Sequence, residues 1–271
     1  MNRRTPAMLA AACVLALAAL AAFAPERLPE TLPDRANLGP LGSFPFGTDD
    51  RGRPLLAYAQ QGARVVLFPA AASAVLVGVL AVCGGLLRCV GDERVDGVVQ
   101  AFGEVLGALP RMVVILVAAL LMGSGGGLLP LGLLWALLSA PGAMDEAASV
   151  AERLGGARFV EALRAHGFSW SRIFLYHIVA LNLRPVVVRQ AAETAMQVTF
   201  LELSLSYLAL ASEQPSFTHP DSMRSWADIL QLGYLSLALG KPTGHALVLG
   251  LVLVALVTAS AMLLTRAARA R

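Results

Sequence analysis

Residues 63–87 read ARVVLFPAAASAVLVGVLAVCGGLL, an apolar run long enough to form a membrane-spanning helix. A helix needs about 20 apolar residues, and at least about 17, to cross the hydrocarbon core of a bilayer. Further runs of this kind lie at 98–122, 128–145, 185–211 and 244–265, and residues 8–24 just reach the lower limit. The sequence therefore predicts an all-α, polytopic membrane bundle of about six transmembrane helices.

The composition supports a membrane protein rather than a soluble one. Of the 271 residues, 57% are hydrophobic and only 14% are charged, and the mean hydropathy is +0.68. A soluble domain carries about 25% charged residues, so this chain lacks the polar side chains that would cover a water-facing surface.

Several groups of arginines fall on one side of the predicted spans, whereas the loops on the opposing side are mixed in charge. These groups are Arg3, Arg4, Arg88, Arg94, Arg153, Arg158, Arg164, Arg172, Arg266, Arg269 and Arg271. Cytoplasmic loops are enriched in basic residues, so both termini and the segment 150–178 are predicted to be cytoplasmic. The loops 25–61 and 212–243 are predicted to lie outside. The basic residues form no run, so nucleic acid is not predicted as a partner.

The first apolar run also resembles a cleavable signal peptide. Two arginines precede an alanine-rich core, which ends in the small-x-small triplet Ala22-Phe23-Ala24. Pro25 follows the triplet directly and makes a poor cleavage site, so an uncleaved first span is the preferred interpretation. Cleavage would leave five spans and need not change the orientation of the others.

Motifs for catalysis and for cofactor binding are absent from the sequence. The glycine-rich stretch 123–127 is followed by Leu-Leu-Pro, so it is no phosphate loop, and no His-Glu-x-x-His or Gly-x-Ser-x-Gly occurs. The three cysteines have no CxxC spacing, and the four histidines are scattered. The sequence thus predicts no enzyme activity, no metal site and no cofactor in this chain, and energy for any transport has to come from elsewhere.

Ionisable side chains within the predicted spans allow two interpretations. Such groups cost about 2.5 to 3.5 kcal/mol at the centre of a membrane helix on insertion scales, so they usually face protein or water. Glu104 and Arg111 are seven residues apart and are predicted to share a helix face. Arg189 and Glu193 are four apart and can pair, whereas Glu202 stands alone. These residues either line a translocation path or subunit interface, or only hold helices together. We favour the second role for Arg189 and Glu193.

The segment 159–178, FVEALRAHGFSWSRIFLYHI, is the best-patterned amphipathic stretch outside the spans. Phe159 and Leu163 are one turn apart and share a face of an expected helix. Gly167 suits the left-handed position that ends a helix, and Ser169 can cap the next one. A charged helix-Gly-helix segment in a cytoplasmic loop either docks a partner or simply faces water.

Five short motifs lie in order along residues 45–265. They are PFGTDDRGR at 45–53, SAPG at 139–142, FVEAL at 159–163 with Gly167, ELSLSYL at 202–208 and SWADIL at 225–230. Together with about six spans, they resemble the permease subunits of dipeptide, oligopeptide and nickel ABC importers. In that family the counterpart of the third motif, the EAA loop, engages the ATPase.

The chain departs from the family's pattern at several positions. Leu163 replaces the last alanine of the EAA triplet, and Leu181 replaces the proline that ends the loop. Asp145 and Ala148 stand where arginines usually follow the serine–proline–glycine motif, and Ala209 replaces a glycine. These differences leave the fold expectation unchanged and indicate a divergent branch.

The resemblance implies a permease subunit of a bacterial ATP-driven importer in the cytoplasmic (inner) membrane, carrying peptides, nickel or metal–chelator complexes. Its implied partners are a sister permease, two cytoplasmic ATPase subunits that bind ATP and Mg, an external substrate-binding protein and membrane lipid. Residues 1–61 would form the first span and external loop. Residues 62–271 would form the permease core, with the coupling loop at about 150–178.

The candidate site residues fall into three groups. The ATPase-coupling group is Phe159, Glu161, Ala162, Leu163 and Gly167. The outer motif is either a structural clamp or a landing point for the binding protein, and consists of Gly47, Thr48, Asp49, Asp50, Gly52 and Arg53. The candidates for a path or an interface are Glu104, Glu202, Ser204 and Ser206.

A non-transport membrane scaffold that docks another cytosolic protein through the same loop is the alternative function. It predicts neither an ATPase nor a sister permease in the complex. A membrane-embedded enzyme is a third option, which predicts ATP-independent activity that is lost on mutating Glu104, Glu193 or Glu202. The sequence does not choose among the substrates.

Overall fold

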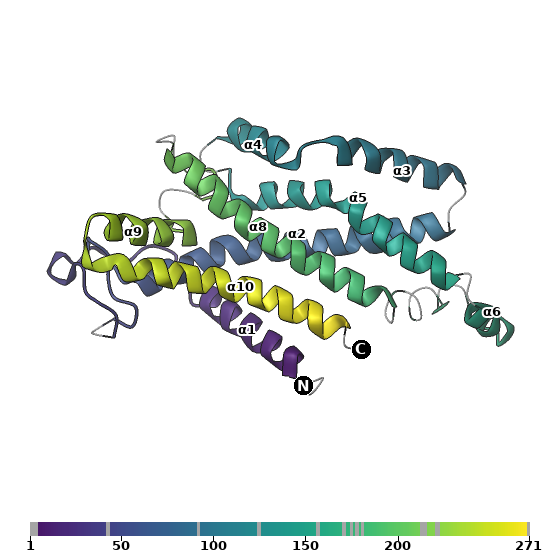
Figure 1. Ribbon diagram of the computed structural model, residues 1–271, viewed down its shortest axis with the longest axis horizontal. Coiled ribbons are helices and arrows are strands. Elements are labelled where there is room, and N and C mark those ends of the chain that lie inside the picture. Colours follow the sequence, from purple (N-terminus) through teal and green to yellow (C-terminus); the bar gives the residue numbers. More distant parts are fainter. Residues whose placement is uncertain are drawn as a thin grey trace.

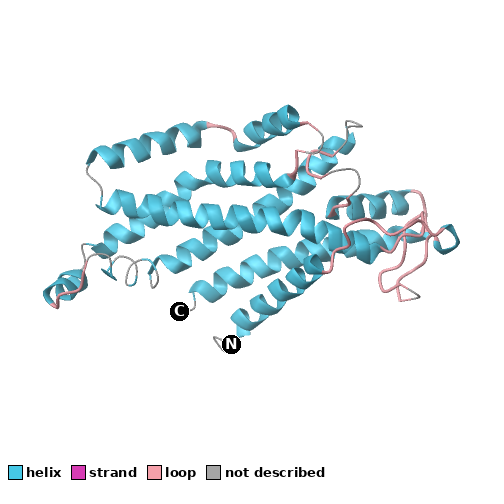
Figure 2. Ribbon diagram, turned by 180° about the vertical axis from the view of Figure 1, so that it is seen from behind, coloured by secondary structure: helices cyan, strands magenta, loops and turns pink. Residues whose placement is uncertain are grey.

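The computed structural model is built of helices joined by turns and loops, with no β-strand among the described residues (Figure 1; Figure 2). The structure describes residues 5–41, 44–90, 93–123, 126–155, 158–169, 172–173, 176, 179, 182–211, 216–219 and 223–269. Within these ranges, the side chains of 86–90, 93–96, 152, 154–155, 158–161 and 210–211 are not described.

Five helices are long. They are α1 (Thr5–Ala22), α2 (Leu55–Val90), α5 (Leu128–Gly155), α8 (Arg184–Ala211) and α10 (His245–Arg269). The shorter helices are α3 (Glu93–Ala108), α4 (Arg111–Met122), α6 (Arg158–Ala165) and α9 (Trp226–Ala238). Two 3-10 turns, η1 (Pro33–Arg35) and η3 (Pro242–Gly244), lie in the connections.

Four helices of the described chain are long and apolar enough to cross a membrane: α1, α2, α5 and α10 with the turn before it. A fifth span results if α3 and α4 count as one. α8 has the length of a span, at 28 residues, but it carries four charged side chains. The expected all-α polytopic membrane bundle is confirmed, with α8 as its most polar long helix.

The apolar run 98–122 is divided between α3 and α4, which are bent by 75° relative to each other. Pro110 stands at the break; proline lacks the N–H of a helical hydrogen bond and disfavours helical backbone in the residue before it. The prediction that Glu104 and Arg111 share a helix face is therefore wrong. Glu104 is exposed on α3, where it accepts a hydrogen bond from Gln100 at 3.2 Å.

α2 is the central helix and packs against α5, α8, α1 and α9. Small buried side chains make its contact with α5, among them Ala81 on α2 and Ala143 and Ala147 on α5. A Cβ placed on Gly85 would lie only 2.7 Å from the Cβ of Ala147. Small residues let helix backbones approach closely within a membrane, and here they allow α2 and α5 to form the centre of the bundle.

α9 lies within 212–243, which the sequence predicted only as an outer loop. Ser225 and Asp228 form a capping box that fixes the start of the helix. Trp226 follows the cap, is fully buried, and donates from its Nε1 to the carbonyl oxygen of Ala59 on α2 at 3.0 Å. The loop is thus folded onto the bundle, with α9 packed on α10 and α2.

The two ends of the bundle carry different features (Figure 1). α9 and the loop between α1 and α2 lie at one end, and α6 lies at the other. α1 and α10 run side by side, and the start of α1 and the end of α10 both point away from α9. This arrangement agrees with the predicted separation of the outer loops from the segment 150–178.

Candidate functional site

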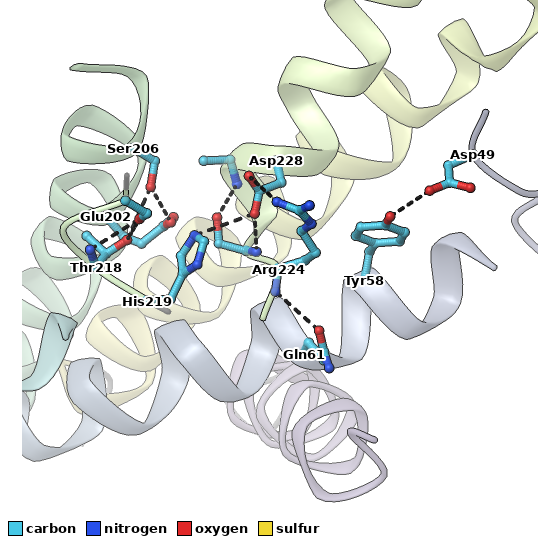
Figure 3. Close-up of polar contacts among 12 residues, drawn as sticks. Asp49, Tyr58, Gln61, Glu202, Ser206, Thr218, His219, Arg224 and Asp228 are labelled. Atoms are coloured by element: carbon cyan, nitrogen blue, oxygen red, sulfur yellow. Dashed lines mark hydrogen bonds and ion pairs between the residues drawn. The ribbon is translucent and has the colours of Figure 1, made fainter. Parts of the chain in front are cut away.

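The motif at 45–53 forms a loop at the start of α2 that is held together by hydrogen bonds. Asp49 is only 2% exposed, and its Oδ1 accepts from the backbone N–H groups of Arg51, at 2.9 Å, and Arg53, at 2.7 Å. Its Oδ2 accepts from the hydroxyl of Tyr58 on α2 at 2.6 Å (Figure 3). Hydrogen bonds to an ionised group are among the strong ones, so this carboxylate ties the loop to the helix.

Thr48 and two glycines also fix the conformation of this loop. The Thr48 hydroxyl accepts from the N–H of Leu38 at 2.9 Å and donates to the carbonyl oxygen of Arg35 at 2.5 Å. Gly47 and Gly52 have φ values of +76° and +75°, in the left-handed region that favours glycine. Of the two interpretations of this motif, the geometry favours the structural clamp.

A second polar cluster joins α8 to the chain just before α9 (Figure 3). Glu202 is fully buried, and its Oε1 accepts from the Ser206 hydroxyl at 2.9 Å, which itself lies 3.2 Å from the Thr218 hydroxyl. His219 is also buried, and its Nε2 lies 3.5 Å from Oδ2 of Asp228. Glu202 makes no ion pair with any described residue, as predicted, but it is not isolated: Ser206, one turn further along α8, donates to it, and the folded outer segment brings Thr218 next to Ser206.

A polar cavity of about 340 Å³ opens between α4, α5 and α8. Its lining residues are Arg111, Ser139, Gly142, Ala143, Glu146, Arg189, Gln190, Glu193, Thr194 and Gln197. The predicted pair of Arg189 with Glu193 is present at 3.3 Å, and Arg189 also pairs with Glu146 of α5. The Gln190 side-chain amide donates to Oε2 of Glu146, the oxygen that Arg189 also contacts, at 2.7 Å.

Glu146 and the uncharged members of this cavity were not predicted as site residues, although Ser139 and Gly142 belong to the SAPG motif. The signal was their spacing: Ser139, Gly142 and Glu146 recur at three and four residues along α5. The polar residues of α8 recur in the same way, from Arg189 to Gln197. Residues three and four apart share one face of a helix, so both helices carry a polar face that charged residues alone do not reveal.

Two of the four predicted path residues lie away from any such cluster. The Ser204 hydroxyl is exposed and donates to the carbonyl oxygen of Phe200 in its own helix at 2.8 Å. Glu104 is exposed on α3. In the outer motif, which is a separate group, Asp50 is exposed beside the buried Asp49. The structure brings together only Glu202 and Ser206.

α6 forms the first part of the segment 159–178 and stands beyond the end of α5, apart from the main bundle (Figure 1). Ala162 is exposed and Leu163 is half-buried. The side chains of Phe159 and Glu161 lie outside the described residues. The helix thus presents backbone and side chains beyond the packed part of the molecule, where a partner has access.

Gly167 ends α6 as predicted. Its φ is +81°, its N–H donates to the carbonyl oxygen of Arg164 at 2.9 Å, and the N–H of Phe168 donates to that of Leu163 at 3.1 Å. This pair of hydrogen bonds is the Schellman arrangement, which satisfies carbonyl groups at a helix end. The left-handed position proposed for Gly167 is confirmed.

Replacing Gly167 by valine should loosen the end of α6. A left-handed conformation costs a residue with a Cβ about 1–2 kcal/mol, and it suits a β-branched side chain especially badly. Limited digestion with trypsin should then cut faster after Arg164 and Arg172, which are both exposed. Gly167→Asn is the matched control, because asparagine tolerates this conformation, and it should be cut at nearly the wild-type rate. Equal rates for all three proteins would contradict the expectation.

No family model matches the chain. The chain is similar to the dipeptide transport system permease protein DppC of Bacillus subtilis, with 28% identity over 182 residues, which is 66% of this chain and 55% of that protein. It is similar to the oligopeptide transport system permease protein OppC of Escherichia coli K12, with 27% identity over 191 residues, 69% of this chain and 59% of that protein. OppC of B. subtilis is 27% identical over 175 residues, 63% of this chain and 55% of that protein.

The aligned part therefore spans less than two thirds of the length of these relatives. The resemblance to dipeptide and oligopeptide ABC permeases that the five motifs predicted is confirmed.

Proposed function

We propose that this chain is the transmembrane permease subunit of an ATP-driven importer of peptides in a bacterial cytoplasmic membrane. The observation that carries the proposal is its similarity to permeases of dipeptide and oligopeptide transport systems over about two thirds of its length. The apolar helices of the bundle supply the membrane-crossing part. Because the sequence has no phosphate loop, ATP and Mg would be bound by two separate ATPase subunits.

The exposed helix α6 is the proposed contact with the ATPase. It stands apart from the packed bundle, and Gly167 fixes where it ends. In the proposed mechanism, ATP binding draws the two ATPases together, α6 moves with them, and the bundle alternates between outward and inward access. A sister permease would complete the pathway, and an external binding protein would deliver the substrate.

The test is to isolate the tagged chain from native membranes in mild detergent and to identify the co-purifying proteins by mass spectrometry. Recovery of an ATPase and a second multi-span permease supports the importer. Recovery of neither, from a well-folded preparation, contradicts it and supports the scaffold. Peptides bound to a co-encoded binding protein would support the peptide assignment, whereas nickel or a metal–chelator complex would overturn it.

Charge reversal at Glu161 should remove the ATPase from this complex. A lysine in the middle of a docking helix replaces an acceptor by a donor of opposite charge, and like charges across an interface cost several kcal/mol. We expect Glu161→Lys to reduce the recovered ATPase by about tenfold or more, with unchanged expression. Glu30→Lys, an equal charge reversal at an exposed site in the loop at the opposite end, is the control and should keep the ATPase. Full ATPase retention and transport by Glu161→Lys would remove this residue from the contact.

A further inference from the structure

We propose that the polar cavity between α4, α5 and α8 is a binding subsite for the charged ends of a short peptide, its α-ammonium and α-carboxylate groups. This inference rests on the proposed function and names where the cargo contacts the chain. The cavity volume, about 340 Å³, falls in the range of about 300–1,000 Å³ typical of small-ligand pockets. Residues of three helices line the cavity, so it forms only when these helices pack together in the bundle.

The charges of the cavity match a ligand that carries both signs. Arg189 is shared by two carboxylates, Glu146 and Glu193, so this cluster has one negative charge in excess. Arg111 lines the same cavity, is exposed, and makes no ion pair with any residue that the structure describes. The excess carboxylate charge suits an ammonium group, and the Arg111 guanidinium suits a carboxylate, which it can bind with two parallel hydrogen bonds. A peptide with both ends free leaves no charge of the site unmatched.

A buried hydroxyl at the cavity wall independently indicates a ligand. Ser139 is 8% exposed, and its Oγ has no hydrogen-bond partner among the described residues. Buried polar groups in proteins are almost always hydrogen-bonded, because leaving one unpaired costs free energy. Ser139 lines the cavity, so a polar ligand atom there would supply the missing bond.

The Arg189–Glu146 ion pair also joins α8 to α5, so one alternative is that the cluster only holds these two helices together. That role leaves both Arg111 and Ser139 unexplained, since neither takes part in the cluster around Arg189. A ligand with both charges and polar backbone atoms accounts for all of these groups together.

Trp135 provides a signal for occupancy. Its Nε1 donates to the side-chain oxygen of Gln197, a cavity residue, at 2.9 Å. The full-length chain, purified from membranes with the subunits that accompany it and placed in lipid nanodiscs, is titrated with Ala-Ala, N-acetyl-Ala-Ala and Ala-Ala-amide while tryptophan fluorescence is followed. Trp135→Phe should abolish the saturable change, which assigns the signal to this site.

Ala-Ala should bind, and blocking either end should weaken binding by about tenfold, the loss of one charge-assisted contact. Arg111→Gln should lower the affinity for Ala-Ala to that of wild type for Ala-Ala-amide, with little effect on the amide itself. Arg64→Gln removes an exposed arginine from α2, outside this cavity, and should bind as wild type does. Arg111 is exposed, so its replacement leaves the fold intact.

Equal binding of free and blocked peptides, unchanged binding by Arg111→Gln, or no saturable signal up to about 10 mM peptide overturns the subsite. These results are separate from the proposed function, because co-purification of the ATPase does not depend on this cavity. Failure of the titration with the ATPase present overturns the subsite alone, whereas absence of the ATPase overturns the importer.

Discussion

Gly233→Ala should lower the free energy of unfolding by about 3 kcal/mol, at the upper end of typical overpacking costs. A Cβ at this position would lie 2.0 Å from the backbone nitrogen and 2.5 Å from the Cα of Leu247, and backbone atoms cannot move aside as a flexible side chain can. Gly233 is buried where α9 packs on α10, so the two helices have to separate. The midpoint of thermal unfolding in detergent should fall by roughly 10 °C.

Gly107→Ala is the matched control. This glycine also lies inside a helix, α3, but apart from its chain neighbours and its own helix backbone nothing comes within 4 Å of the position where its Cβ would be. Alanine there should be neutral, or should stabilise the helix by up to about 1 kcal/mol through its higher helix propensity. A Gly233→Ala protein that unfolds at the wild-type temperature would contradict the close packing of α9 on α10.

Asp49→Ala should also destabilise the protein by about 3 kcal/mol. The substitution removes the acceptor for two backbone N–H groups and for the Tyr58 hydroxyl, and buried donors left unpaired cost about 1–3 kcal/mol each. The loop should detach from α2, so the expected result is a lower midpoint of thermal unfolding and less assembled complex.

Two variants separate the clamp from a docking role. Asp50→Ala removes the exposed neighbouring carboxylate and should leave stability unchanged. Tyr58→Phe removes a single hydrogen bond and should cost about 1 kcal/mol. Normal stability and assembly of Asp49→Ala, combined with lost stimulation by a binding protein, would instead assign the motif to docking.

Sequence periodicity and length predicted the long helices because a membrane span needs a continuous apolar run, and such a run is visible in the chain. The break at Pro110 was not predicted, because the run that this proline interrupts is apolar on both sides. α9 was not predicted either, because this helix is short and lies between polar segments. The Ser225–Asp228 spacing is a capping box and could have revealed where α9 begins.

The candidate site was predicted less well than the fold. A pair four residues apart on one helix, such as Arg189 and Glu193, follows from helix geometry alone. The third member, Glu146, comes from α5, and only tertiary packing places it against Arg189. Likewise, Thr218 reaches Ser206 beside Glu202 because the outer segment folds back on the bundle, which no local spacing encodes.

α5 is a single helix from Leu128 to Gly155, so it extends from the cavity almost to the start of α6. It carries Ser139 and Glu146 at the cavity, and it ends three residues before α6 begins. At about 1.5 Å per residue, Glu146 and Gly155 are roughly 14 Å apart along the axis of this helix. Pro141 stands between Ser139 and Glu146 and weakens the helix ladder there. A displacement of α6 would therefore tilt the part of α5 that follows Pro141, with the proline as the hinge. This tilt would change the distance between Ser139 and Glu146, which lie on either side of the proline.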